Sequence, residues 1–306
     1  AGVLEKYIGE DIDVVIPNNV VSIGAEAFCN CEGIRSVTIP ENVIEIKDGS
    51  VEDISYIYRR EATGAFKGCK NLIEVKFPKS LKKIGVAAFY ECRNAKFVFP
   101  QNDYPMEDGL SINADAFYCC SKMERIASPI SYIGSRAFCR CASLKEVRLS
   151  DSLKTIGSSS FASSGIEEFV CPQNLKWIGD SSFEYCRNLK KVVINRNIES
   201  IGKNFIIGCE SLEVLQLPDG DYKFEEQDNY KLKSSISKIM EEKTKVVFSD
   251  LNHKVVGDKL IIAEGVKEIR KEAFRGEHYK TVVLPETIEK INDYAFSIRD
   301  LNSINI

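Results

Sequence analysis

Apolar residues recur along the chain in a unit of about 21 to 23 residues. Each unit presents Ile-Gly, Ala-Phe, Cys, Leu, Val-x-Ile-Pro, Val and again Ile-Gly in this order, with polar residues between them. The phenylalanine position is held by Phe28, Phe66, Phe89, Phe117, Phe138, Phe161, Phe183, Phe274 and Phe296, with Ile206 in its place once. A fixed period of this length is typical of solenoid proteins. The pattern therefore predicts about ten stacked units, preceded by a half-unit at the N-terminus.

One unit is expected to supply one short strand and one return segment. In Val37-x-Ile39-Pro40 the alternating inward residues predict a strand that Pro40 ends, because proline withdraws a backbone donor. A turn residue such as Asn42 follows, whose side chain is expected to bond to nearby backbone groups. The glycine after the return segment, as at Gly134, is expected to permit a tight or positive-φ bend. No unit can bury its apolar face alone, so we expect a single array over residues 1–306 with its strands in a parallel sheet.

The middle residue of each strand is expected to point outward, while its neighbours, such as Val147 and Leu149, feed the core. These outward residues are Val15, Thr38, Lys76, Val98, Arg148, Val170, Val193, Gln216, Ile261 and Val283, and six of the ten are aliphatic and β-branched. The strand surface is therefore one candidate partner-binding site, with Val98, Arg148, Val170 and Val193 among its residues. The alternative is that Val and Ile occur here only because they suit any strand.

Three insertions interrupt the period, at residues 47–62, 101–111 and 219–258. Extra residues in a solenoid leave the stack as loops, which often carry binding. The first contains residue types enriched at interface hot spots, and is a second candidate partner-binding site or a packed lateral flap: Tyr56, Tyr58, Arg59 and Arg60. The second is expected to be a simple loop. The third predicts a helix that lies on the side of the array or recruits a partner, from the spacing of Leu232, Ile236, Ile239 and Met240.

Most of the 11 cysteines fall at one position of the unit, three residues after the phenylalanine. They are expected to stack as a buried ladder of small side chains: Cys31, Cys69, Cys92, Cys120, Cys141, Cys186 and Cys209. Cys171 takes an inward strand position. Cys29, Cys119 and Cys139 follow the phenylalanine by one or two residues and are predicted to be exposed thiols. Cys119 and Cys139 belong to neighbouring units, so free thiols and a disulfide both stay open, the bond requiring Cα atoms within about 7 Å.

Composition and charge argue against several classes of function. Hydrophobic residues make up 44% and charged residues 28%, which is typical of a soluble folded protein, and no apolar run predicts membrane insertion of this segment. The net charge of −4 argues against nucleic acid as the main partner, because phosphate binding needs concentrated positive charge. The only two histidines, His253 and His278, lie in no catalytic or metal-binding motif. We therefore expect no enzymatic activity, no metal and no cofactor, with a thiol-redox or other enzyme as the less favoured alternative.

Two units, IGSRAFCRCASLKEVRLSDSLKTIG at residues 133–157 and IGDSSFEYCRNLKKVVINRNIESIG at 178–202, resemble the BspA-like (Treponema-type) leucine-rich repeats. The resemblance covers nearly all of residues 12–306. It implies a leucine-rich-repeat solenoid with a parallel sheet of short strands, in which the rest is irregular structure. It brings no catalytic residues.

The roles implied by this resemblance are those of secreted or cell-surface proteins that bind a host protein, matrix or another cell. A cytoplasmic leucine-rich-repeat scaffold with reduced thiols is the alternative. The chain begins at Ala1 without an initiator Met or an apolar leader, so a targeting segment that was cleaved or lies outside this sequence is compatible with it. The repeat specifies neither the ligand, protein or glycan, nor the oligomeric state.

Overall fold

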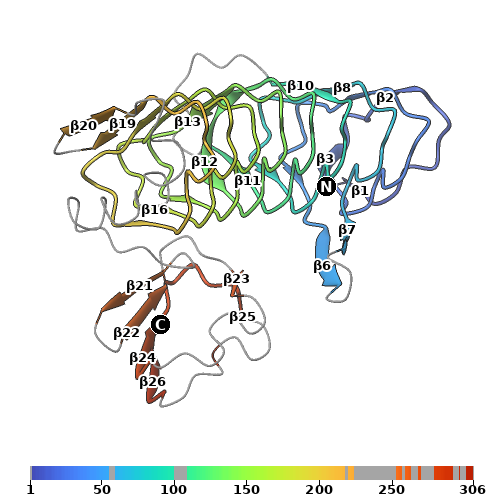
Figure 1. Cartoon of the computed structure of the whole chain (residues 1–306). Coiled ribbons are helices and arrows are strands. Elements are labelled where there is room, and N and C mark those ends of the chain that lie inside the picture. Colours follow the sequence, from blue (N-terminus) through green and yellow to red (C-terminus); the bar gives the residue numbers. More distant parts are fainter. Residues whose placement is uncertain are drawn as a thin grey trace.

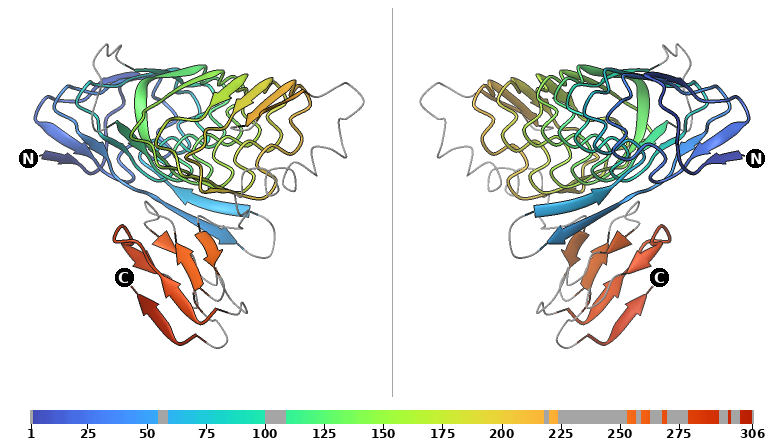
Figure 2. Two further views of the ribbon diagram at one scale, coloured as in Figure 1. Left: turned by 90° about the vertical axis from the view of Figure 1, so that its left-hand side faces the viewer. Right: turned by 90° about the vertical axis from the view of Figure 1, so that its right-hand side faces the viewer.

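In the computed structural model the repeats wind into a solenoid of stacked coils (Figures 1 and 2). The structure describes residues 2–54, 59–99, 109–217, 220–223, 253–256, 259–262, 268–269, 279–291, 296 and 301–305. Parallel strands from successive coils pair with one another, and none of the described residues is helical. The predicted leucine-rich-repeat solenoid is confirmed, whereas the predicted helix around residues 232–240 lies outside the described part of the chain.

Each coil crosses two sheets instead of the one that the sequence predicted. The predicted Val-x-Ile strands form the strand face: β2 (Asp13–Val15), β4 (Ser36–Thr38), β8 (Glu74–Lys76), β10 (Lys96–Val98), β13 (Glu146–Leu149), β15 (Glu168–Val170), β17 (Lys191–Val193) and β19 (Val214–Leu217). The return segments pair in a second sheet, the return sheet: β1 (Gly2–Leu4), β3 (Val20–Ile23), β5 (Glu45–Ile46), β9 (Lys83–Ile84), β11 (Leu110–Ile112), β12 (Arg125–Ile133), β14 (Thr155–Ile156), β16 (Trp177–Ile178) and β18 (Ser200–Ile201). The long strand β12 runs through both sheets, because its first residues pair with β13 and its last, Ile133, pairs with β14. The expectation of one strand per unit is wrong, because stacking also aligns the backbone groups of the return segments, and buried N–H and C=O groups need partners.

The phenylalanine position forms a continuous stack of rings through the interior. Consecutive rings from Phe28 to Phe183 have centroids 4.7 to 5.7 Å apart and planes within 16° of parallel. Each of these rings is at most 1% exposed, and Ile206 takes the next position with the same burial. Stacked aromatic pairs add stabilisation beyond the area they bury. The ring stack therefore ties every coil to its two neighbours.

The cysteine position forms a second ladder, whose thiols act as hydrogen-bond donors. Each thiol donates to the phenylalanine carbonyl of the preceding coil at 2.9 to 3.1 Å, in the pairs Cys69–Phe28, Cys92–Phe66, Cys120–Phe89, Cys141–Phe117, Cys186–Phe161 and Cys209–Phe183. A carbonyl oxygen has two lone pairs, and the second is used within the coil: Phe117 O also accepts from Cys120 N at 3.0 Å. The buried ladder is confirmed from Cys69 onward, while Cys31 at the first rung is only half-buried because a half-unit precedes it.

The recurring glycines serve close packing, and the expectation of a positive-φ bend at them is wrong. A Cβ on Gly157 would lie 2.5 Å from Ser135 N of the preceding coil, and one on Gly179 would lie 2.5 Å from Ser158 N. The left-handed backbone falls instead on other residues, among them Cys119 at φ 61° and Arg140 at φ 62°, two residues after the phenylalanine. Glycine is therefore needed where backbones of adjacent coils touch.

Further strands lie beyond the regular coils. β20 (Gly220–Lys223) pairs antiparallel with β19, and β6 (Ser50–Ile54) with β7 (Arg59–Thr63) makes a hairpin that projects from the array (Figure 1). The remaining strands are β21 (His253–Val256), β22 (Lys259–Ile262), β23 (Glu268–Ile269), β24 (Thr281–Val283), β25 (Lys290–Ile291) and β26 (Ser303–Asn305). They have a small core of their own around Leu260 and Val282. A single array over residues 1–306 stays a prediction, because residues 224–252 lie outside the described part.

Candidate functional site

The strand face presents the outward residues that the sequence pointed to. Val98 is 44% exposed and Val170 is 56% exposed, Arg148 is exposed and Val193 is half-buried. Val15 near the N-terminus is 74% exposed. These residues are therefore available to a partner, but they do not form one apolar strip, because charged side chains such as Arg148 separate them.

A change in repeat spacing interrupts the strand face. In the other described coils, the core residue that precedes the strand lies six positions after the phenylalanine position, as Leu144 does after Phe138 and Leu189 after Phe183. From Phe161 to Ile166 the spacing is five, since Ser164-Gly-Ile replaces the usual Cys-x-x-Leu. This coil is short by one residue just before its strand.

The short coil separates β13 from β15 on the strand face. Within the described residues β13 pairs only with β12, and β15 pairs only with β17. In several other coils the second inward residue of a strand donates its N–H to the next coil, as Phe77 does to Val98 O and Cys171 to Val193 O, both at 2.9 Å. The equivalent Leu149 has no such ladder with Val170. The return sheet stays continuous here, because β14 pairs with both β12 and β16.

The separation opens a cleft of about 410 Å³ between β13 and β15. Its apolar lining comes from both coils: Val147, Leu149, Phe161, Ile166, Phe169 and Cys171. Val147 and Leu149, which were expected to feed the core, pack against it but are only half-buried, because no strand pairs with them on the β15 side. Asp151 and Glu168 are the charged residues of the lining, and both are exposed. The cleft is thus lined by apolar side chains from both coils and carries two carboxylates at its rim.

The insertion at 47–62 is anchored on the side of the array. Tyr56 and Tyr58 lie outside the described residues, and Arg59 and Arg60 belong to β7, so their binding role stays a prediction. At the base of the hairpin, Ala62 packs in a small cluster with Ala87 and Tyr90, which Val51 and Tyr118 adjoin. The base of the hairpin therefore packs against the coils as a flap does.

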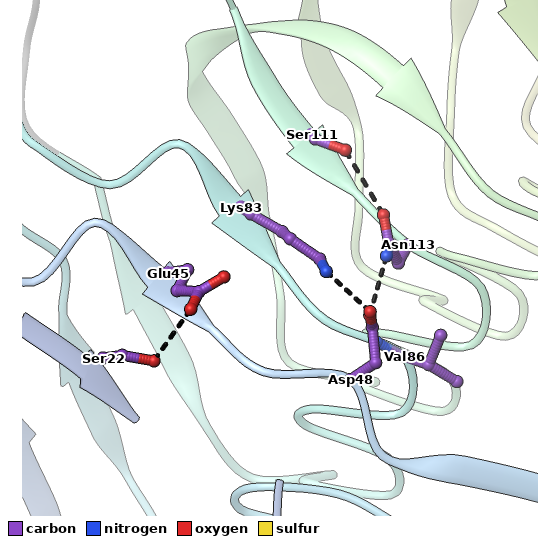
Figure 3. Close-up of polar contacts among 7 residues, drawn as sticks. All are labelled: Ser22, Glu45, Asp48, Lys83, Val86, Ser111 and Asn113. Atoms are coloured by element: carbon purple, nitrogen blue, oxygen red, sulfur yellow. Dashed lines mark hydrogen bonds and ion pairs between the residues drawn. The ribbon is translucent and has the colours of Figure 1, made fainter. Parts of the chain in front are cut away.

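Asp48 fixes the point where this insertion leaves the coil (Figure 3). Its carboxylate accepts hydrogen bonds from Lys83 Nζ at 2.6 Å, Asn113 Nδ2 at 2.7 Å and the Val86 N–H at 2.9 Å. Burial alone would raise the pKa of Asp48, but these three donors together lower the pKa below its ordinary value. Ser111 in turn donates to Asn113 Oδ1 at 3.2 Å. Asp48 is thus a structural clamp that spans three coils.

Cys119 and Cys139 lie side by side but are not the exposed thiols that the sequence predicted. Cys119 N donates to Cys139 O at 2.9 Å, and both residues are buried, at 7% and 9% exposure. Arg140 lies beside Cys119: its guanidinium is 5.9 Å from the centroid of the Tyr118 ring and interacts with the Cys119 thiol. Both are free thiols in the structure, while Cys29 is half-buried. A disulfide between them stays a prediction.

Comparison with known proteins assigns the repeat. A model of the BspA type leucine rich repeat region matches residues 10–103, 110–236 and 244–306, in six copies. The matches span most of the chain, and the chain therefore belongs to the BspA-type leucine-rich-repeat family. A comparison with curated proteins finds no match.

Solved structures share the fold. A leucine rich cell surface protein from Faecalibacterium prausnitzii is 22% identical, with a TM-score of 0.52 over 99% of this chain and 72% of that one. A leucine-rich repeat protein from Bacteroides ovatus is also 22% identical, with a TM-score of 0.52 over 96% of this chain and 87% of that one. Among the described residues of our chain, no helix has the length and apolar character needed to cross a membrane.

Proposed function

We propose that this chain is a non-enzymatic protein-binding module of a secreted or cell-surface protein, and that it contacts a host protein, matrix or another cell through its strand face. The observation that carries the proposal is the strand face itself, where Val98 and Val170 are 44% and 56% exposed and where Val170 lines an open cleft. A buried core needs neither exposed valines nor an open cleft, whereas exposed apolar area is common at binding sites.

The family supports this proposal. Leucine-rich repeats are solenoids, and extended solenoid surfaces serve recognition. The Faecalibacterium prausnitzii protein of the same fold is a cell surface protein. The hairpin at 47–62 is a second binding surface to be tested beside the strand face.

An array of matrix proteins, host surface proteins and glycans tests the proposal. The wild-type chain is compared with a Val98→Arg, Val170→Arg double variant and with a variant lacking residues 47–62. We expect the double variant to lose at least about tenfold in affinity, because two buried arginines at an interface centre carry a large desolvation cost. If binding is lost only when residues 47–62 are deleted, the hairpin is the binding site. If binding survives in both the double variant and the deletion variant, neither surface is the site.

The second candidate is a cytoplasmic scaffold, which the thiol chemistry favours. All 11 cysteines are free in the structure, and free thiols are typical of reducing compartments. Mass spectrometry of the protein isolated from its own cells, alkylated before lysis, separates the two: a Cys119–Cys139 disulfide supports export, and 11 alkylated cysteines support the scaffold.

A further inference from the structure

The cleft between β13 and β15 has two strand edges in addition to an apolar interior. Across every other described junction of β15, β17 and β19, inward residues donate to the following coil, as Ile194 N does to Gln216 O at 2.9 Å. At the cleft, β13 and β15 face each other without a ladder. An unpaired strand edge is a template for another extended chain.

The cause of the opening makes it a fixed feature of the fold. The missing residue lies between Ser164 and Ile166, and Gly165 N is held by Cys141 O at 3.2 Å, so the short turn is tied to the coil before it. Behind the cleft, Phe138 and Phe161 remain stacked at 5.2 Å. The two coils are therefore paired in the return sheet and separated at the strand face.

The negative charge at the rim of the cleft favours extended segments that carry basic residues. Asp151 and Glu168 are exposed, and no cation stands among the residues that line the cleft. The ion pair nearest in sequence, Lys145 Nζ to Glu167 Oε1 at 3.3 Å, joins the two coils at the entrance to their strands. An occupant that carries Lys or Arg beside its apolar residue would complement this rim.

We propose that the cleft between β13 and β15 binds an extended segment of a partner protein by strand addition. The segment pairs its backbone with the free edge of β13 or β15, inserts one apolar side chain between Leu149 and Phe169, and sets basic residues against Asp151 and Glu168. Backbone pairing supplies affinity and the side-chain pocket supplies selectivity. The inference rests on the strand face being the binding surface, and it names the class of ligand.

A phage-displayed library of random decapeptides tests this on the whole chain. The first test variant carries an Asn inserted between Ser164 and Gly165. This insertion restores the six-residue spacing and is expected to let β15 pair with β13, which closes the cleft. A second, Val170→Arg, places a bulky cation beside the cleft without touching the core. Ile44→Arg is the control, because Ile44 is 50% exposed and lies outside the strand face.

We expect enrichment of peptides that alternate apolar and polar residues and carry Lys or Arg. Their affinity should fall at least about tenfold on the insertion and on Val170→Arg, stay unchanged on Ile44→Arg, and fall when the peptide backbone is N-methylated. No enrichment, or equal binding to the insertion variant, would overturn the inference. The array experiment distinguishes this inference from the proposed function. If a macromolecular ligand no longer binds the Val98→Arg variant but still binds the insertion variant, the strand face is its binding site and the cleft is not.

Discussion

The cysteine ladder makes a quantitative prediction at Cys141. This residue is fully buried, and its thiol donates to Phe117 O at 3.1 Å. Cys141→Ala removes the sulfur and the donor. The lost transfer free energy is about 1 kcal/mol for one methylene-sized group. The cavity of about 20 Å³ adds about 0.5 kcal/mol, and the hydrogen bond contributes about 1 kcal/mol. We therefore expect Cys141→Ala to lower the free energy of unfolding by about 2.5 kcal/mol.

Cys141→Ser separates the donor from the apolar volume. A serine hydroxyl keeps the donor toward Phe117 O, and Ser164 already takes this position in another coil. We expect Cys141→Ser to cost less than Cys141→Ala, about 1 kcal/mol. The assay is equilibrium urea unfolding followed by far-ultraviolet circular dichroism, with exposed Ile44→Ala as the control, expected to lie within about 0.5 kcal/mol of wild type. A serine variant less stable than the alanine variant would refute the donor role and leave the cysteines as apolar filling.

Three further predictions concern the charges and the remaining thiols. Arg136→Ala should cost about 3 kcal/mol in urea unfolding, because the Asp115 carboxylate, 1% exposed, loses a two-bond partner at 2.8 and 2.9 Å; Arg136→Lys should cost less, and a loss under about 1 kcal/mol would contradict this. The lowered pKa of Asp48 stabilises the fold fully above the ordinary value of 3.8, and this contribution disappears as the pH falls through the folded-state pKa. Wild type should therefore lose its advantage over Asp48→Asn in acid unfolding curves, and a gap that is constant with pH would count against the clamp. Burial raises the pKa of Cys139 to about 12, which lowers its thiolate fraction about 1,000-fold at neutral pH. Iodoacetamide should accordingly label half-buried Cys29 well before Cys139, as mass spectrometry of timed samples can follow, and equal rates would show that Cys139 is accessible.

The sequence predicted the features of the fold that recur in every unit. The phenylalanine and cysteine positions keep the same place in every unit, three residues apart, so their burial follows from the repeat alone. The two-residue return strands, such as β14 and β16, were missed because two residues carry no alternation of apolar and polar positions. Burial of Cys119 could not be read from its own unit, since the side chain that interacts with its thiol, Arg140, belongs to the next coil.

The candidate site could be predicted only in part. The outward valines follow from strand alternation, and the structure places Val98 and Val170 as expected. The cleft depends on a single missing residue between Phe161 and Ile166, and this signal was present in the sequence as a spacing of five in place of six. Its effect on Val147 and Leu149 depends on how the next coil is displaced in space, which the period does not specify.

The short coil also determines how the array should respond to mechanical load. From β15 to β19 the strand face pairs adjacent coils without a break, whereas between β13 and β15 only the return sheet, the ring stack and local contacts hold them. A force that bends the solenoid away from its strand face would therefore meet less resistance at this junction than between β15, β17 and β19. We expect the molecule to flex there as a hinge between two stiff halves, so that a tensioned attachment through either half would change the width of the gap.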